Sequence, residues 1–367
     1  MKIILVAGAR PNFMKIAPIL REISNYDEIK ALLVHTGQHY DHSMSDSFFN
    51  DLGIKTPDYH LGCGGGSHSE QTAKVLVEFE KLCIKEKPDF VLVVGDVNST
   101  IAAGLVAKKL QIKLIHVESG LRSGDRNMPE EINRLATDAI TDMFFTTEKN
   151  GSENLLNEGQ SKDKVNFVGH VMIDNLYYQL EKLSESNISE NIIKIKQFLP
   201  EKYFCMTLHR PSNVDNKEIL EELLTALNEI AKKTPIVFPC HPRTRKMIEQ
   251  FGLEHLINNK SGIIITPPLG YNDFLYLWKD CSAMLTDSGG LQEETTALKI
   301  PCLTIRHNTE RPITVEVGSN ILVGTDVELL KKEVDNILSG NFKTGRIPDL
   351  WDGKASERIV KTIINDK

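Results

Sequence analysis

Acidic residues follow several apolar runs between Val91 and Arg134. Asp96 comes directly after VLVVG, Glu118 comes directly after LIHV, and Glu130 stands at the predicted start of a helix. In an open parallel sheet the carboxyl ends of adjacent strands form the rim of the ligand crevice, so we expect these side chains to lie close together. Carboxylates in such a place can take protons from a bound substrate and return them.

Each acid also has a simpler interpretation, because acids commonly cap helices or end buried strands. For a single acid that interpretation is the better one. Three acids on consecutive strand-to-helix loops favour a functional cluster instead.

A second group of residues could bind phosphate. Ser288, Gly289 and Gly290 lie between an apolar run and a predicted helix, where a hydroxyl and free N–H groups make an anion pocket. Glu294, one turn further on, could bind the two hydroxyls of a ribose. The alternative is a capped helix with Glu293 and Glu294 in its first turns. The glycines favour phosphate, because they let a ligand approach the backbone closely.

Cationic residues follow the first predicted strand in the loop GARPNF. Arg10 and Lys15 could contact a nucleotide phosphate there, although Lys15 fits a solvated position equally well. The loop lacks the GxGxxG pattern, which argues against a dinucleotide site.

Histidines and arginines end further predicted strands. His209 and Arg210 form the better functional pair, since imidazole titrates near neutrality and arginine pairs with phosphate in a forked geometry. His241 and Arg311 add polar contacts on neighbouring loops, whereas His116 is interpreted as structural. No His, Cys and carboxylate group has metal-ligand spacing, so neither a metal nor a cofactor is predicted.

Composition restricts the class of protein. The 367 residues exceed one ordinary core and suggest two domains. A net charge of -7 gives no general field for nucleic acid or an anionic membrane, and neither is a predicted partner. The six cysteines are scattered, which fits a reducing compartment, and no apolar run reaches the roughly 18 residues that span a bilayer. We therefore expect a soluble, cytoplasmic protein.

The elements that must position these residues alternate regularly. Continuous apolar runs predict buried strands, and amphipathic stretches between them predict helices, as in parallel sheets covered on both faces. The predicted fold class is α/β, with two Rossmann-like, doubly wound domains facing a central cleft. Residues 1–170 form the domain with the acids, and residues 171–353 form the domain with the phosphate pocket. Leu61–Ser67 is predicted as a flexible loop that follows no strand, and Ser184–Asn191 as the passage between domains.

The motifs together carry a family resemblance. In order and spacing, the chain closely resembles the non-hydrolysing UDP-N-acetylglucosamine (UDP-GlcNAc) 2-epimerases in the segments GARPNFMK, GDVNST, HVESGLRSGD, MPEEINR, LHR, TDSGGLQEE and ERP. The resemblance implies a fold similar to that of the GT-B glycosyltransferases, with the last helix, 354–367, packing back on the first domain. It also implies a homodimer.

The implied reaction inverts C2 of UDP-GlcNAc to give UDP-ManNAc, a precursor for cell-surface polysaccharides. UDP is eliminated to leave a 2-acetamidoglucal and is then added again with the opposite configuration at C2. By resemblance, the catalytic residues are Asp96, Glu118, Glu130 and His209. The residues around UDP are Arg10, Lys15, Ser288, Glu294 and Arg311.

The chain departs from the family pattern in three places. Ala9 and Asn12 replace the usual Thr and Glu, Pro211 and Ser212 replace the end of HRRE, and Gln38–Ser47 differs from QHxxMLDQ. The last two segments help form a second, allosteric UDP-GlcNAc site in bacterial members, and the sequence leaves its presence here open. The substrate could also be a relative such as UDP-2,3-diacetamido-glucuronate.

Two other classes of function share the predicted UDP pocket. One is a GT-B sugar transferase or a hydrolysing epimerase, which would differ in the use of the acids. The other is a non-catalytic binding protein for nucleotide sugars, which would leave the acids without a task.

Overall fold

The computed structural model describes residues 1–37, 46–257 and 262–366. The chain forms two compact units, the first comprising Met1–Tyr177 with Asp349–Lys367 and the second comprising Tyr178–Pro348. Each unit is built around its own parallel sheet. The predicted fold class of two parallel-sheet α/β domains is therefore confirmed.

The first unit contains a seven-stranded sheet in the order β3-β2-β1-β4-β5-β6-β7, with all neighbours parallel. Its strands are β1 (Lys2–Ala7), β2 (Lys30–His35), β3 (Tyr59–His60), β4 (Phe90–Val94), β5 (Lys113–Val117), β6 (Met143–Thr146) and β7 (Val165–Phe167). The strand order reverses between β1 and β4. The carboxyl ends of β1, β4 and β5 are consequently neighbours at the place where such sheets bind ligands.

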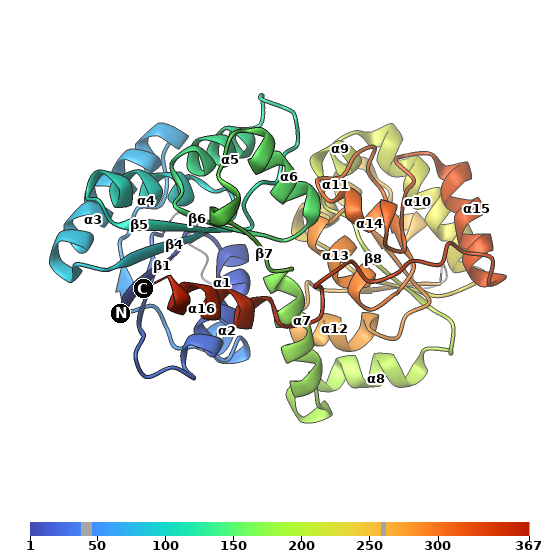
Figure 1. Ribbon diagram of the computed structural model, residues 1–367. Coiled ribbons are helices and arrows are strands. Elements are labelled where there is room, and N and C mark those ends of the chain that lie inside the picture. Colours follow the sequence, from blue (N-terminus) through green and yellow to red (C-terminus); the bar gives the residue numbers. More distant parts are fainter. Residues whose placement is uncertain (38–45, 258–261, 367) are drawn as a thin grey trace. The chain divides into compact units, whose positions relative to one another are not determined.

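Helices cover both faces of this sheet (Figure 1). They are α1 (Arg10–Ile23), α2 (Asp46–Asp51), α3 (His68–Glu86), α4 (Asn98–Lys109), α5 (Pro129–Ile140), α6 (Lys149–Asn157), the first part of α7 (Val171–Lys182) and α16 (Ala355–Asn365). All five residues of β4 are buried, as its continuous apolar run predicts.

The second unit repeats this architecture with a six-stranded sheet in the order β10-β9-β8-β11-β12-β13. Its strands are β8 (Phe204–Thr207), β9 (Ile236–Pro239), β10 (Ile263–Thr266), β11 (Ala283–Thr286), β12 (Cys302–Thr304) and β13 (Asn320–Leu322). Its helices are α8 (Glu190–Phe198), α9 (Pro211–Val214), α10 (Lys217–Ala231), α11 (Pro242–Phe251), α12 (Tyr271–Trp278), α13 (Gly289–Ala297), α14 (Pro312–Glu316) and α15 (Val327–Leu338). The switch point lies between β8 and β11.

The C-terminal helix α16 packs beside α1 in the first unit (Figure 1). Its first turn is capped by Asp174 of α7, whose carboxylate accepts from the N–H groups of Ala355 (3.1 Å) and Ser356 (2.7 Å). The buried Trp351 donates its indole N–H to the carbonyl of Thr147 (3.2 Å). These contacts tie the end of the chain to the sheet that begins it.

One local expectation needs correction. The glycine-rich loop Leu61–Ser67 does follow a strand, because Tyr59–His60 pairs in parallel with β2. A two-residue strand is too short to produce a recognisable apolar period. The stretch Ser184–Asn191, predicted as the passage between domains, holds the 3-10 turn Glu185–Asn187 and the first residues of α8. The segment Gln38–Ser47, one of the two on which an allosteric site would depend, lies largely outside the described residues, because 38–45 are not described.

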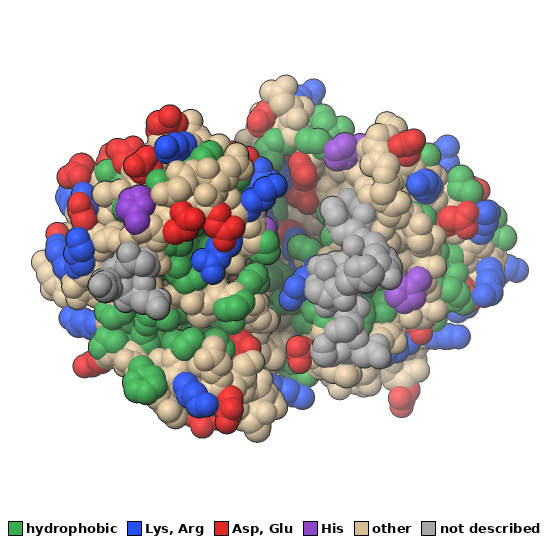
Figure 2. All heavy atoms as spheres, turned by 180° about the vertical axis from the view of Figure 1, so that it is seen from behind, with side chains coloured by type: hydrophobic (Ala, Val, Ile, Leu, Met, Phe, Trp, Pro, Cys, Tyr) green, Lys and Arg blue, Asp and Glu red, His purple; other side chains and the backbone are tan. Residues whose placement is uncertain are grey.

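The surface carries charges of both signs. Figure 2 shows acidic and basic side chains interspersed over one face, in keeping with the modest net charge of -7. No helix in the described part of the chain is long and apolar enough to cross a membrane.

The buried His35 predicts a pH dependence of stability. Burial, and to a lesser extent the charge of His60, lowers the pKa of His35 from 6.5 to about 4. Between pH 6.5 and 4, His35 therefore binds a proton in the unfolded chain but not in the folded chain. We expect the free energy of unfolding to fall by roughly 3 kcal/mol from this residue as the pH drops from 6.5 to 4.

The test is urea unfolding of the wild type and His35→Gln across that pH range. His35→Gln should lose this part of the dependence of the unfolding free energy on pH. His60→Gln, at an exposed position, should keep most of it. Equal slopes for the wild type and His35→Gln would contradict the prediction.

Candidate active site

The side chain of Asn12 closes the loop after β1. Its Oδ1 accepts from the N–H groups of Gly8 (3.1 Å) and Ala9 (2.9 Å), and its Nδ2 donates to the carbonyl of Val94 (3.2 Å). A glutamate could accept the first two bonds but could not donate the third. Asn12, which stands where the family pattern has Glu, thus links the loop after β1 to the end of β4.

Lys15 points toward the acids from the second turn of α1. Its ammonium group forms an ion pair with the carboxylate of Glu118, so the solvated position considered for Lys15 is not the one it takes, and its contact with a phosphate stays a prediction. Arg10, at the start of the same helix, lies with its guanidinium 5.0 Å from the ring centre of Phe48. The loop between β4 and α4 leaves space for the ion pair, because a Cβ at Gly95 would lie 3.2 Å from the Lys15 ammonium.

Glu118 has an unusual backbone conformation. Its φ of 67° lies in the left-handed region, which non-glycine residues adopt at a cost of about 1–2 kcal/mol. The N–H group of Glu118 donates to the carbonyl of Phe145 on β6 (3.0 Å), which holds this turn. Strained residues of this kind concentrate at functional sites.

Asp96 is held by Arg134 of α5. The Nε and Nη2 groups of Arg134 both donate to Oδ2 of Asp96, at 2.9 and 2.6 Å. Nδ2 of Asn133 donates to the Asp96 carbonyl (2.9 Å). One carboxylate oxygen of Asp96 is thereby held by Arg134.

The two glutamates at the start of α5 have different surroundings. Glu131 is buried, pairs with Arg134 (2.9 Å) and accepts from the N–H groups of Ser123 (2.9 Å) and Gly124 (3.1 Å). Glu130 is exposed and makes no side-chain hydrogen bond or ion pair within residues 1–37, 46–257 and 262–366. Glu131 is therefore the structural member of the pair, and Glu130 remains available for chemistry.

His116 has the structural role that the sequence suggested. Its Nδ1 lies 2.7 Å from Asp138 and its Nε2 lies 2.8 Å from the carbonyl of Gly95. The second oxygen of Asp138 accepts from Gly120 (3.0 Å) and pairs with Arg122 (2.8 Å). Burial acts to raise the pKa of Asp138, but its electrostatic and hydrogen-bond contacts with His116 and Arg122 outweigh burial and lower the pKa. This buried network connects the loops that carry Asp96 and Glu118.

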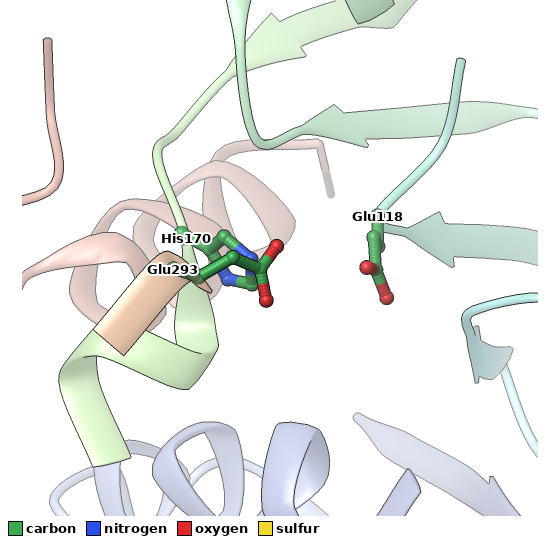
Figure 3. A group of neighbouring side chains, drawn as sticks. All are labelled: Glu118, His170 and Glu293. Atoms are coloured by element: carbon green, nitrogen blue, oxygen red, sulfur yellow. The ribbon is translucent and has the colours of Figure 1, made fainter. Parts of the chain in front are cut away.

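A further histidine lies beside Glu118. Figure 3 labels Glu118 after β5 and His170 at the start of α7, both in the first unit, and Glu293 of the second unit. A ring nitrogen of His170 lies within 4.8 Å of a Glu118 carboxylate oxygen. Two ligands are fewer than the three or four that a zinc site uses, so this pair alone makes no metal site.

The second unit contains a cavity of about 320 Å³ at the carboxyl ends of β8, β9 and β11. Its apolar walls include Pro268, Leu269, Phe274 and Trp278. Its polar groups come from His209, His241, Tyr271, Ser288, Gly290 and Glu294. Five of the residues predicted from the sequence are therefore brought together here. An apolar pocket with a few converging polar groups suits a nucleoside.

Asp287 organises the loop that carries His209. Its Oδ2 accepts from the N–H groups of His209 and Arg210, each at 2.7 Å, and its Oδ1 lies 2.9 Å from Nδ1 of His209. Asp287 is fully buried, which acts to raise its pKa, but the hydrogen bonds and charge of His209 outweigh burial and lower it. The guanidinium of Arg210 also donates to the Asp287 carbonyl (3.4 Å).

His241 caps α11 with its side chain. Its Nδ1 accepts from the N–H group of Arg243 (3.2 Å), so this nitrogen carries no proton. Burial, followed by the charges of His209 and Arg243, lowers the pKa of His241. The rings of His209 and His241 are 5.7 Å apart between centres.

The start of α13 presents Ser288, Gly289 and Gly290 at the end of β11. The Ser288 side chain makes no cap hydrogen bond. Glu294, one turn along, accepts from the hydroxyl of Tyr271 (2.6 Å). Arg311, at the start of α14, forms an ion pair with Glu293. Each of the two adjacent glutamates is therefore bound by a side chain from outside α13.

Comparison with known proteins places the chain in a family. The model of the UDP-N-acetylglucosamine 2-epimerase family matches residues 21–364. A UDP-N-acetylglucosamine 2-epimerase of Methanococcus maripaludis is 45% identical over 370 residues, covering 100% of this chain and 99% of that protein. The chain belongs to the UDP-N-acetylglucosamine 2-epimerase family. The resemblance predicted from the motifs is confirmed.

Further proteins are similar to this chain over nearly its whole length. The crystal structure of the Methanocaldococcus jannaschii UDP-GlcNAc 2-epimerase, in complex with UDP-GlcNAc and UDP, has a TM-score of 0.83 and 43% identity, with both chains covered completely. A UDP-2,3-diacetamido-2,3-dideoxy-D-glucuronate 2-epimerase of Pseudomonas aeruginosa is 38% identical, covering 98% of this chain and 99% of that protein. A lipopolysaccharide outer core galactosyltransferase, at 13% identity and a TM-score of 0.57, shares the fold, which is GT-B-like.

Several residues of this epimerase-family site escaped the sequence interpretation. Arg134, Asp138 and His170 were not singled out, and neither was Asp287. The spacing of Glu131 and Arg134 is the i, i+3 spacing of a helical ion pair, which was a usable signal. No local pattern connects Asp287 with His209, because they are 78 residues apart and meet only through the pairing of β8 with β11.

Proposed function

We propose that this chain is a non-hydrolysing UDP-GlcNAc 2-epimerase, an isomerase that interconverts UDP-GlcNAc and UDP-ManNAc. The observation that carries the proposal is the pair of carboxylates, Asp96 and Glu118, at the ends of adjacent strands, each paired with a cation in a chain 45% identical to such an enzyme. The acids of the first unit transfer protons, and the second unit binds UDP.

The reaction needs groups that act at C2 and at the leaving oxygen. A carboxylate takes the C2 proton while the C1–O bond breaks, which leaves a C1–C2 double bond and free UDP. UDP then returns to C1, and a second acid delivers a proton to the opposite face of C2. Asp96, Glu118 and Glu130 are the proposed proton-transfer groups, and His209 acts at the pyrophosphate.

The UDP moiety needs an apolar pocket and donors for its phosphates. The cavity of about 320 Å³ in the second unit offers walls for uracil and Glu294 for the ribose hydroxyls. Ser288, Gly289 and Gly290 offer donors at a helix N-terminus for the phosphates. Further proposed phosphate contacts come from Arg10, Lys15, Arg210, His241 and Arg311.

A related UDP-sugar is a second candidate substrate. The Pseudomonas aeruginosa relative is named for a diacetamido-glucuronate, and it is nearly as similar as the UDP-GlcNAc enzymes. Compared with UDP-GlcNAc, such a substrate has a carboxylate at C6 in place of the hydroxymethyl group and an acetamido group at C3 in place of the hydroxyl. The enzyme should prefer UDP-GlcNAc, because that is the substrate named for the 45% identical protein.

Incubation with UDP-GlcNAc in D₂O tests the proposed function. The expected product is UDP-ManNAc with deuterium at C2, because the proton returned to the second face comes from an enzyme acid in exchange with solvent. Mass spectrometry and proton NMR measure the label and its position. Heat-denatured protein is the control.

Two outcomes would contradict the proposal. Release of free ManNAc and UDP would identify a hydrolysing enzyme. Tight UDP binding without exchange at C2 of either UDP-sugar would identify a binding protein.

We also propose that the enzyme works as a cytoplasmic homodimer. All six cysteines are unpaired and buried, which suits a reducing compartment. Light scattering coupled to size-exclusion chromatography should give twice the mass of 41.2 kDa.

A further inference from the structure

One oxygen of Asp287 has no assigned task in the proposed reaction. Oδ2 is occupied by the N–H groups of His209 and Arg210, and it also lies 3.3 Å from Nδ2 of Asn213. Oδ1 is buried and makes no hydrogen bond of ordinary geometry with any described residue, the His209 ring included. Its polar neighbour is the His209 ring, with Nδ1 at 2.9 Å. A buried carboxylate oxygen is therefore aimed at one nitrogen of a histidine that lines the nucleoside cavity.

This contact limits the protonation of the ring. An ionised carboxylate oxygen presents only lone pairs, so a ring nitrogen 2.9 Å away is favoured in its protonated form, which places the proton of a neutral His209 on Nδ1. The Nε2 atom is then the ring nitrogen left for a ligand, and Asp287 can stabilise the imidazolium that forms when Nε2 gains a proton.

The neighbouring His241 has the opposite arrangement. Its Nδ1 accepts from the N–H group of Arg243, so a proton on the neutral ring must lie on Nε2. The two rings, 5.7 Å apart, thus enter the same cavity as different tautomers. The partner of the His241 ring is thus a backbone N–H group at a helix start, whereas that of the His209 ring is a carboxylate.

We propose that Asp287 is a positioning residue that fixes the tautomer and orientation of His209, so that Nε2 meets the diphosphate of the substrate. The inference rests on the proposed function and adds a specific partner to His209. The same carboxylate holds the backbone at His209 and Arg210, so one buried group sets both the loop and the ring.

Asp287→Asn separates these two tasks. The amide oxygen can take the place of Oδ2 and accept from the two N–H groups, which keeps the loop. The amide nitrogen then faces Nδ1 and donates to it, which forces the proton of His209 to Nε2 and removes the anion that stabilises a cationic ring. The fold should therefore remain while the histidine is wrongly protonated.

The test is a cycle of four proteins: the wild type, Asp287→Asn, His209→Ala and the double variant. We expect Asp287→Asn to lower kcat on the order of 100-fold with its normal histidine present. In the His209→Ala background the same change should lower kcat less than about threefold, because residues that act as a unit are non-additive. The matched control is Asp335→Asn, which removes an exposed aspartate paired with Lys233 in the same unit.

A spectroscopic readout does not depend on turnover. With ¹⁵N-labelled histidine, the His209 signals should show a proton on Nδ1 in the wild type and on Nε2 in Asp287→Asn. In a UDP titration of the four proteins, Asp287→Asn should weaken UDP binding when His209 is present and have little effect in the His209→Ala background.

The proposal would be overturned if Asp287→Asn lowered kcat equally in the wild-type and His209→Ala backgrounds, or if the tautomer of His209 did not change. Asp287 would then only support the loop. An absence of epimerase activity in the wild type would contradict the proposed function, whereas the tautomer and the UDP cycle would still test Asp287.

Discussion

Asp96→Asn is expected to lower kcat about 1,000-fold, which corresponds to roughly 4 kcal/mol of transition-state stabilisation. Asparagine has nearly the shape of aspartate and can still accept a hydrogen bond from Arg134. It cannot take a proton from C2 or return one. The affinity for UDP should change less than about threefold, because the proposed uridine cavity lies in the second unit.

The measurements are steady-state kinetics with UDP-GlcNAc and calorimetric titration with UDP. Asp142→Asn is the matched control, since Asp142 is also an ion-paired aspartate of the same sheet but lies before β6, at the amino ends of the strands. It should retain wild-type kcat. A parallel loss of UDP binding in Asp96→Asn would mean that Asp96 has a structural task only.

Arg134→Lys is expected to lower kcat about 100-fold while changing KM little. The guanidinium of Arg134 bridges Asp96 and Glu131 with three donors, whereas the ammonium group of lysine is a single point that cannot reproduce this fork. Asp96 would then keep its charge but lose its fixed orientation. A misplacement of about 1 Å in a catalytic group can reduce the rate by about two orders of magnitude.

The control and the cross-check use the same substitution elsewhere. Arg358→Lys changes an arginine of α16 that pairs with Asp352 in the same unit, and it should retain kcat. In the Asp96→Asn background, Arg134→Lys should lower kcat less than about threefold, because its effect passes through Asp96. A full 100-fold loss in that background would show that Arg134 acts independently of Asp96.

Much of the fold follows from local patterns. The continuous apolar runs of β1, β4 and β5 are long enough to identify buried parallel strands, and the amphipathic stretches between them identify helices. Strand β3 escaped because its pairing depends on β2 and not on its own two residues. The sequence also singled out five residues that line the cavity of the second unit, because three of them, His209, His241 and Ser288, come shortly after predicted strands.

Residue types and spacing by themselves determined the α/β class, the family and the carboxylates with their strand ends. The tertiary structure alone decided how these groups are held. Arg134 reaches Asp96, Lys15 reaches Glu118, and Asp287 reaches His209 across 38, 103 and 78 residues of chain respectively. Such contacts arise where parallel strands bring distant loops to one sheet edge, and no local period in the sequence records which loops become neighbours.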